Sequence, residues 1–183
     1  MSTIPHLSFS HVGLFVSDMP LMRDFYTEVL GFVLTDTGQL DTPNGVVELA
    51  FLSRDPEEHH QIVLASGRPE TLHFNVVNQV SFRVPDIDAL KHFHEALRRQ
   101  PISDIAPVTH GNAISLYFRD PEGNRLELFM DTPWYCEQPC RESIDLTADA
   151  ESIMAAAKAI ARARPGFTSR EAWMAKLRAR LDA

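Results

Sequence analysis

The chain contains the same sequence pattern twice, and an internal duplication strongly restricts the architectures open to it. Residues 11–19 match residues 79–87 position by position at an offset of 68, and residues 51–57 match residues 116–122 at an offset of 65. Each copy should therefore form a structural unit of the same design. Positions where the two copies differ in polar residues are where we expect the functional side chains.

Hydrophobic spacing predicts a strand, a helix and three further strands in each copy. In the first copy, alternation predicts a strand over residues 9–16, and Asp18 and Gly31 are typical of the beginning and the end of a helix. In the second copy, Asp86 begins the equivalent helix. The remaining strands are predicted over residues 32–37, 46–53 and 60–65 and over residues 105–110, 113–119 and 125–130.

This element order predicts an α+β fold made of two tandem βαβββ modules, about 7–66 and 76–131, within one domain over residues 1–131. Because one module cannot bury both faces of its sheet, we expect the two to form a curved, cup-like mixed sheet with the helices outside. Residues 132–183 lie outside the duplication, and their sequence pattern predicts a C-terminal helical extension. The sequence leaves open whether this extension covers the core or bridges two subunits.

Composition narrows the class of protein. The 183 residues are 44% hydrophobic and 23% charged, as in soluble globular proteins, and the formal net charge of −8 argues against a nucleic-acid partner. No apolar run approaches the roughly 20 residues of a membrane span, and the N-terminus does not resemble a signal peptide. The two cysteines, Cys136 and Cys140, are interpreted as free thiols. We therefore expect a cytoplasmic protein without a membrane partner.

Strand alternation selects three candidate metal ligands. His11 lies on the strand face opposite the apolar Val12-Leu14-Val16 stripe, and Gln79 is its duplicate in the second copy. Glu127 stands between two leucines that should face the helix, which directs its carboxylate to the other face, where burial requires a cation or a hydrogen-bond donor. Three protein ligands, His11, Gln79 and Glu127, leave coordination positions open, as a catalytic metal requires.

The first copy offers a contrast. When the two Arg-Asp-Pro-Glu turns are superposed, Ile62 matches Glu127, so the first copy lacks a carboxylate at this place. His60 lies two residues earlier and is expected on the same strand face as Ile62. His60 should therefore reach the same cavity from a displaced position.

Other interpretations of these residues stay open. His11 can be a hydrogen-bonded core histidine, and Glu127 can pair with Arg83 or Arg125 instead of a metal. Gln79 can orient a substrate rather than ligate. Tyr117 lies among apolar strand residues, so packing in the core is an alternative to a role in the site.

At this point the chain resembles the vicinal oxygen chelate superfamily, which comprises glyoxalases, bleomycin-resistance proteins and extradiol dioxygenases. The resemblance covers about residues 7–131 and is carried by the segments 11–16, 25–32, 58–62 and 119–129. It implies the paired-module fold. It does not by itself name a reaction, because this fold supports several chemistries.

The resemblance implies roles for further residues. Extradiol dioxygenases use two histidines and a glutamate around Fe(II), and His59-His60 matches a histidine pair whose second member moves protons. His110 and Tyr117 resemble the pair that binds the catecholate. Gln79 departs from the dioxygenase pattern, which has histidine there, whereas glyoxalases do use a glutamine ligand in a first strand.

The sequence thus favours a metal-dependent dioxygenase-like enzyme that acts on a small, catechol-like vicinal diol with O₂. The expected cofactor is a divalent metal, Fe(II) first, with Mn(II), Zn(II) or Ni(II) as alternatives. Two other functions remain open: a glyoxalase-like isomerase or lyase on the same scaffold, and a metal-free small-molecule-binding protein. By resemblance alone, we expect a homodimer.

Overall fold

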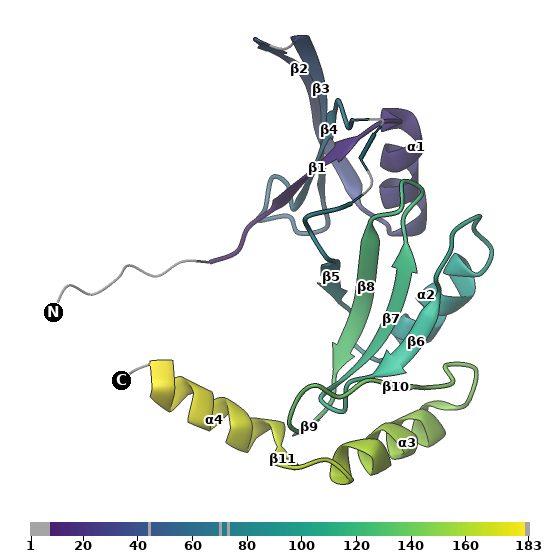
Figure 1. Ribbon diagram of the computed structural model, residues 1–183, viewed down its shortest axis with the longest axis vertical. Coiled ribbons are helices and arrows are strands. Elements are labelled where there is room, and N and C mark those ends of the chain that lie inside the picture. Colours follow the sequence, from purple (N-terminus) through teal and green to yellow (C-terminus); the bar gives the residue numbers. More distant parts are fainter. Residues whose placement is uncertain (1–7, 44, 70, 73, 182–183) are drawn as a thin grey trace, which may run out of the picture. The chain divides into compact units, whose positions relative to one another are not determined.

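The computed structural model describes residues 8–43, 45–69, 71–72 and 74–181. The chain divides into two compact units between Asn75 and Val76. Each unit holds one copy of the repeat, and the α+β class, the repeated β-α-β-β-β order and the C-terminal helices are confirmed (Figure 1). Within the described ranges, no helix is both long enough and apolar enough to cross a lipid bilayer.

The first unit is a four-stranded sheet with a helix packed on one face. Its sheet order is β1-β4-β3-β2, in which β1 and β4 are parallel and the other neighbours are antiparallel. The strand β1 begins three residues later than predicted, so His11 directly precedes it. The elements are β1 (Val12–Val16), α1 (Met19–Asp24), the π-helical turn η1 (Phe25–Val29), β2 (Val33–Thr42), β3 (Gly45–Ser53) and β4 (Ile62–Ser66).

Local signals explain the helix of this unit. The Asp18 carboxylate accepts a hydrogen bond from the Leu21 backbone N–H at 2.9 Å, which caps the first turn. The chain leaves the helix at Gly31, whose φ of +72° is accessible to glycine at little cost. The helix buries the side chains of Met19, Met22, Phe25 and Tyr26.

The second unit repeats this arrangement and extends it. Its sheet order is β10-β6-β7-β8-β5, with β5 parallel to β8, and Asp86 caps the helix by accepting from the Ala89 N–H at 2.9 Å. The helix packs on β7 and β8. The repeat elements are β5 (Val80–Arg83), α2 (Ile87–Leu97), β6 (Ala106–Thr109), β7 (Ala113–Arg119) and β8 (Arg125–Asp131).

The C-terminal extension belongs to the second unit and covers the edge of its sheet. The strand β10 (Glu142–Ser143) pairs with β6, and β9 (Trp134–Tyr135) pairs with β11 (Thr168–Ser169). The helices α3 (Ala150–Arg162) and α4 (Arg170–Leu181) follow, with Asp149 as the N-cap of α3 (Figure 1). Pairing with β10 satisfies the backbone groups of an edge strand that would otherwise be open.

The strand register corrects the predicted match between Ile62 and Glu127. Val12 pairs with Ile62 in the first unit, whereas its duplicate Val80 pairs with Leu126 in the second. Ile62 is therefore the counterpart of Leu126 and faces the helix, where it is 1% exposed. The true counterpart of Glu127 is Val63.

The cause is the length of the hairpin loop. Residues 53–61 lie between the paired Leu52 and Ile62, while residues 119–125 lie between the paired Phe118 and Leu126. The first loop is two residues longer, one on each side of its Arg-Asp-Pro-Glu turn, so superposing the turns shifts each strand by one residue. A shift of one residue exchanges the two faces of a strand. His60 consequently precedes β4 and does not share a strand face with Ile62.

This register predicts which of two neighbouring substitutions destabilises the protein. Ile62→Ala removes methyl groups from the buried layer under α1 and should lower the free energy of unfolding by about 2–4 kcal/mol. Val63→Ala, at a half-buried position on the other face, should cost roughly 1 kcal/mol or less. Urea denaturation of both variants measures the difference. A larger loss for Val63→Ala would contradict the register.

Candidate functional site

The second unit places Glu127 on the sheet face opposite α2. Leu126 and Leu128, its neighbours on β8, are buried, and Glu127 itself is 7% exposed. In the sheet register, Glu127 stands between Ser81 on β5 and Tyr117 on β7. Alternation along β8 therefore directs the carboxylate to the face that the sequence predicted.

Two neutral side chains hold this carboxylate. The Ser81 hydroxyl donates to Glu127 Oε2 at 2.6 Å, and the Gln79 amide nitrogen donates to the same oxygen at 3.0 Å. Ser81 lies on β5, which runs parallel to β8, and Gln79 is the residue just before β5. Hydrogen bonds to a carboxylate are strong, but these donors bring no positive charge.

Ser81 was not among the residues predicted from the sequence. It is the duplicate of Gly13, and this polar difference between the two copies is the signal that could have identified it. The alternation that selected Gln79 also places Ser81 two residues further along the same strand face.

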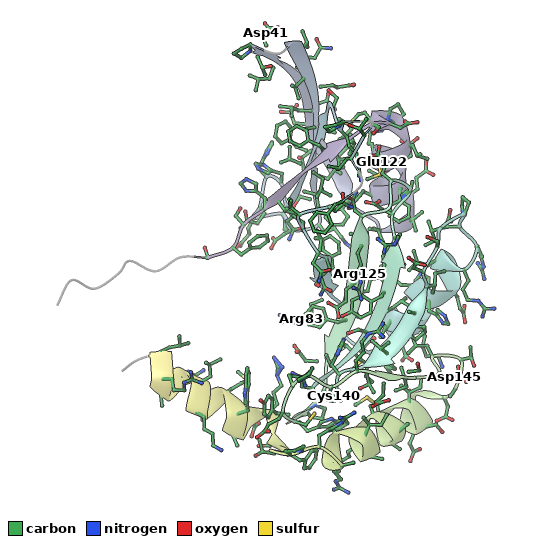
Figure 2. The ribbon with its side chains drawn as sticks, in the orientation of Figure 1. Asp41, Arg83, Glu122, Arg125, Cys140 and Asp145 are labelled. Carbon is green, nitrogen blue, oxygen red and sulfur yellow. The ribbon has the colours of Figure 1, made fainter. Side chains whose placement is uncertain are left out.

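The arginines proposed as alternative partners of Glu127 are engaged elsewhere. Arg83 Nε lies 3.0 Å from Asp131 Oδ2, and the Arg125 guanidinium lies 4.4 Å from the centre of the Tyr117 ring (Figure 2). The basic nitrogen recorded near the carboxylate is His110 Nε2, 3.9 Å from Glu127 Oε1. An ion pair between His110 and Glu127 requires a protonated imidazole.

His110 and Tyr117 form a second pair beside the carboxylate. His110 Nδ1 lies 2.6 Å from the Cys140 carbonyl oxygen, and its Nε2 lies 3.0 Å from the Tyr117 hydroxyl. Because a carbonyl only accepts, Nδ1 carries the proton, and in the neutral ring Nε2 is the acceptor. The C-terminal extension, through Cys140, thus fixes the orientation of a ring in the repeat.

The surroundings of Tyr117 keep its phenol protonated. Burial, followed by the interactions with Glu127, raises the pKa of Tyr117 to about 12. The hydroxyl is therefore a neutral hydrogen-bond donor at physiological pH. The interpretation of Tyr117 as an ordinary core residue fits its burial but not these polar contacts.

The first unit brings His11 and His60 together. Their ring centres are 4.4 Å apart, and Phe51 packs 5.2 Å from His60. His59 Nδ1 lies 2.9 Å from His60 Nδ1, so the predicted histidine pair is in contact. Partial burial, followed by the charges of His11 and His59, lowers the pKa of His60.

Four of the six predicted site residues therefore lie together in the second unit, and the other two touch each other in the first. Among the residues that the structure describes, no group of three or more histidine, cysteine, aspartate or glutamate side chains is placed to hold a metal ion. The predicted set of His11, Gln79 and Glu127 contains only two residues of these types. The convergence of its members from both copies stays a prediction.

The environment of Tyr117 predicts its titration. In the metal-free protein, the phenolate absorbance of Tyr117 should develop near pH 12 rather than near the usual value of about 10. The Tyr117→Phe variant should therefore match the wild type in the absorbance rise near pH 10, with circular dichroism to follow the fold. If the absorbance rise near pH 10 is smaller in Tyr117→Phe by one tyrosine equivalent, Tyr117 titrates as an ordinary phenol and the prediction is wrong.

Comparisons with known proteins agree with the architecture. Residues 8–128 match the profile of the Glyoxalase/Bleomycin resistance protein/Dioxygenase superfamily. A glyoxylase/bleomycin resistance protein/dioxygenase domain from Frankia sp. EAN1pec is 24% identical with a TM-score of 0.56, covering 71% of this chain and 94% of that one. This structural likeness concerns the fold alone.

Two curated relatives from Rhodococcus globerulus are also similar. Biphenyl-2,3-diol 1,2-dioxygenase 3 is 33% identical over 136 residues, and biphenyl-2,3-diol 1,2-dioxygenase 2 is 31% identical over 128 residues. The matches cover 72% and 67% of this chain but 66% and 62% of those proteins. The repeat, the polar face of its second sheet and the profile match over both copies show that the chain belongs to the Glyoxalase/Bleomycin resistance protein/Dioxygenase superfamily.

Proposed function

We propose that the protein is a metal-dependent dioxygenase-like enzyme that acts on a small, catechol-like vicinal diol with O₂. The observation that carries this proposal is the environment of Glu127. Its carboxylate is almost fully buried, and the groups that donate to it, Gln79 and Ser81, are neutral. A buried anion in such a setting is stabilised by a bound cation.

The donor set fits a divalent transition metal. His11 supplies an imidazole nitrogen, Glu127 a carboxylate oxygen and Gln79 an amide oxygen, a mixture suited to Fe(II), with Mn(II), Zn(II) or Ni(II) as alternatives. The Gln79 amide nitrogen donates to Glu127, so its carbonyl oxygen is the atom of this side chain that would serve as a ligand. Three protein ligands leave positions for the two oxygens of a diol.

The other polar residues suit the handling of a diol. When bound, a divalent ion would lower the pKa of a coordinated hydroxyl group. Tyr117 donates a hydrogen bond from a neutral phenol, and His110 presents an Nε2 whose partner nitrogen is fixed by Cys140. His60, in contact with His11, is the proposed acid–base residue.

Similarity supports the choice of reaction. The relative that is 33% identical acts, by its name, on biphenyl-2,3-diol. A vicinal diol on an aromatic ring is also the ligand that two open positions on one metal would chelate. We therefore place a catechol-like substrate ahead of the ligands of the other superfamily members.

Metal content and oxygen uptake test this function. Full-length protein reconstituted anaerobically with Fe(II) should retain about one equivalent and consume O₂ when a catechol is added. Glu127→Gln removes the charge that holds the ion and should lower both readouts at least tenfold. Glu95→Gln, an exposed glutamate on α2, is the matched control and should change neither.

The results also separate the alternative functions. Turnover of a substrate without O₂ consumption in the metal-loaded protein would favour an isomerase or lyase. Failure of the wild type to retain any transition metal would favour a metal-free binding protein.

The role of His60 predicts a different pattern. His60→Ala should reduce oxygen uptake by roughly 10²-fold or more, because a positioned acid–base residue contributes about 10²–10⁴. Metal content should stay near that of the wild type, since His60 is not a proposed ligand. Unchanged turnover, or loss of metal in parallel with turnover, would contradict this role.

A further inference from the structure

A cavity beside Tyr117 carries unbalanced positive charge. It lies within the second unit and has a volume of about 270 Å³. Its walls include Tyr117, three arginines and one aspartate, together with apolar residues such as Ile105. This volume is ample for a small organic acid group.

One arginine is neutralised within the wall. Arg119 Nε lies 2.5 Å from Asp104 Oδ2, and its Nη1 donates to the Gly123 carbonyl at 2.8 Å. Asp104, the one aspartate in the cavity wall, is therefore already paired with Arg119. The cavity therefore retains the charges of the two other arginines, Arg125 and Arg141.

Those two guanidinium groups lie against an aromatic ring. Arg125 is 4.4 Å and Arg141 5.8 Å from the centre of the Tyr117 ring, and among the described residues neither has a carboxylate within ion-pair distance. A cation–π contact contributes about 0.5–1 kcal/mol at an exposed site and leaves the charge unneutralised. Two adjacent cations of this kind, in a chain with a net charge of −8, favour an anionic ligand.

The cavity adjoins the proposed metal site. Arg125 is two residues before Glu127 on β8 and on the same strand face, which places it about 7 Å along the strand at roughly 3.3 Å per residue. Tyr117 connects the two places, because its hydroxyl faces His110 and its ring walls the cavity. A ligand chelated near Glu127 can therefore extend a substituent past this ring.

We propose that Arg125 and Arg141 bind a carboxylate of the substrate, which is then a small aromatic vicinal diol that bears a short acidic side chain. The planar guanidinium matches a carboxylate in shape and hydrogen-bond geometry, and the apolar wall accommodates the carbon atoms that carry it. This inference specifies the substrate of the proposed function and rests on it, although the anion site itself can be tested without turnover.

Equilibrium binding of benzoate to metal-free, full-length protein tests the anion site. Isothermal titration calorimetry at low salt should show binding to the wild type that weakens at least tenfold in Arg141→Gln and in Arg125→Gln. Arg99→Gln, an exposed arginine after α2, is the control and should bind as the wild type. Arg141→Lys keeps the charge but not the planar guanidinium, so its affinity for benzoate should lie between those of the wild type and Arg141→Gln. Absence of benzoate binding, or equal binding by the glutamine variants, overturns the proposal.

A second probe and a kinetic arm complete the test. Inorganic phosphate should bind more weakly than benzoate, and preferential phosphate binding overturns the assignment to a carboxylate. With Fe(II)-loaded protein, Arg141→Gln should raise the KM for 3,4-dihydroxyphenylacetate at least tenfold and leave that for its methyl ester unchanged. An equal rise for the ester overturns the specificity role.

The two proposals fail in different ways. Arginine-dependent benzoate binding without O₂ uptake on any diol refutes the dioxygenase function and leaves the anion site standing. Oxygen uptake on neutral catechols without benzoate binding refutes the anion site alone.

Discussion

The candidate site depends on one costly arrangement, a carboxylate buried on a strand between two others. Glu127 cannot leave the face opposite α2, because Leu126 and Leu128 occupy the apolar layer under the helix. The parallel pairing of β5 with β8 brings Ser81 beside it, and the antiparallel pairing with β7 brings Tyr117. The sheet therefore places a hydroxyl donor on one side of the carboxylate and a phenol on the other, and the compensating positive charge has to come from a ligand or from His110.

Much of the fold follows from signals that act over a few residues. Asp18, Asp86 and Asp149 each cap the helix that their sequence context predicts, because an N-cap needs only its own side chain and the next turn. Alternation within β8 likewise predicts the face of Glu127. These features depend on chain geometry that is the same wherever the segment lies in the fold.

The predictions that failed or were missing involve pairing between segments. The match of Ile62 with Glu127 is wrong because the longer loop of the first hairpin moves the register, which no local pattern reveals. The contact of His110 with the Cys140 carbonyl joins residues thirty positions apart and uses a backbone atom, which carries no residue-specific signal. Ser81 was detectable in principle through its contrast with Gly13.

With the register corrected, the two copies show a division of chemical roles. Phe51 and Val63 occupy the places in the first unit that Tyr117 and Glu127 occupy in the second. The first copy has apolar residues at these two places, and its polar groups, His11, His59 and His60, lie in the segments just before its strands.

The hydrogen bond from His110 to Cys140 has an evolutionary consequence. A segment that was never part of the ancestral repeat sets the tautomer of an imidazole that the repeat provides. Drift or exchange of this appended tail can therefore change the orientation of this imidazole while every strand of the duplicated scaffold is preserved. Related proteins with the same scaffold and different tails would then differ in chemistry. The reason would lie in the tail, whereas the repeat is the part of the sequence by which such proteins are grouped.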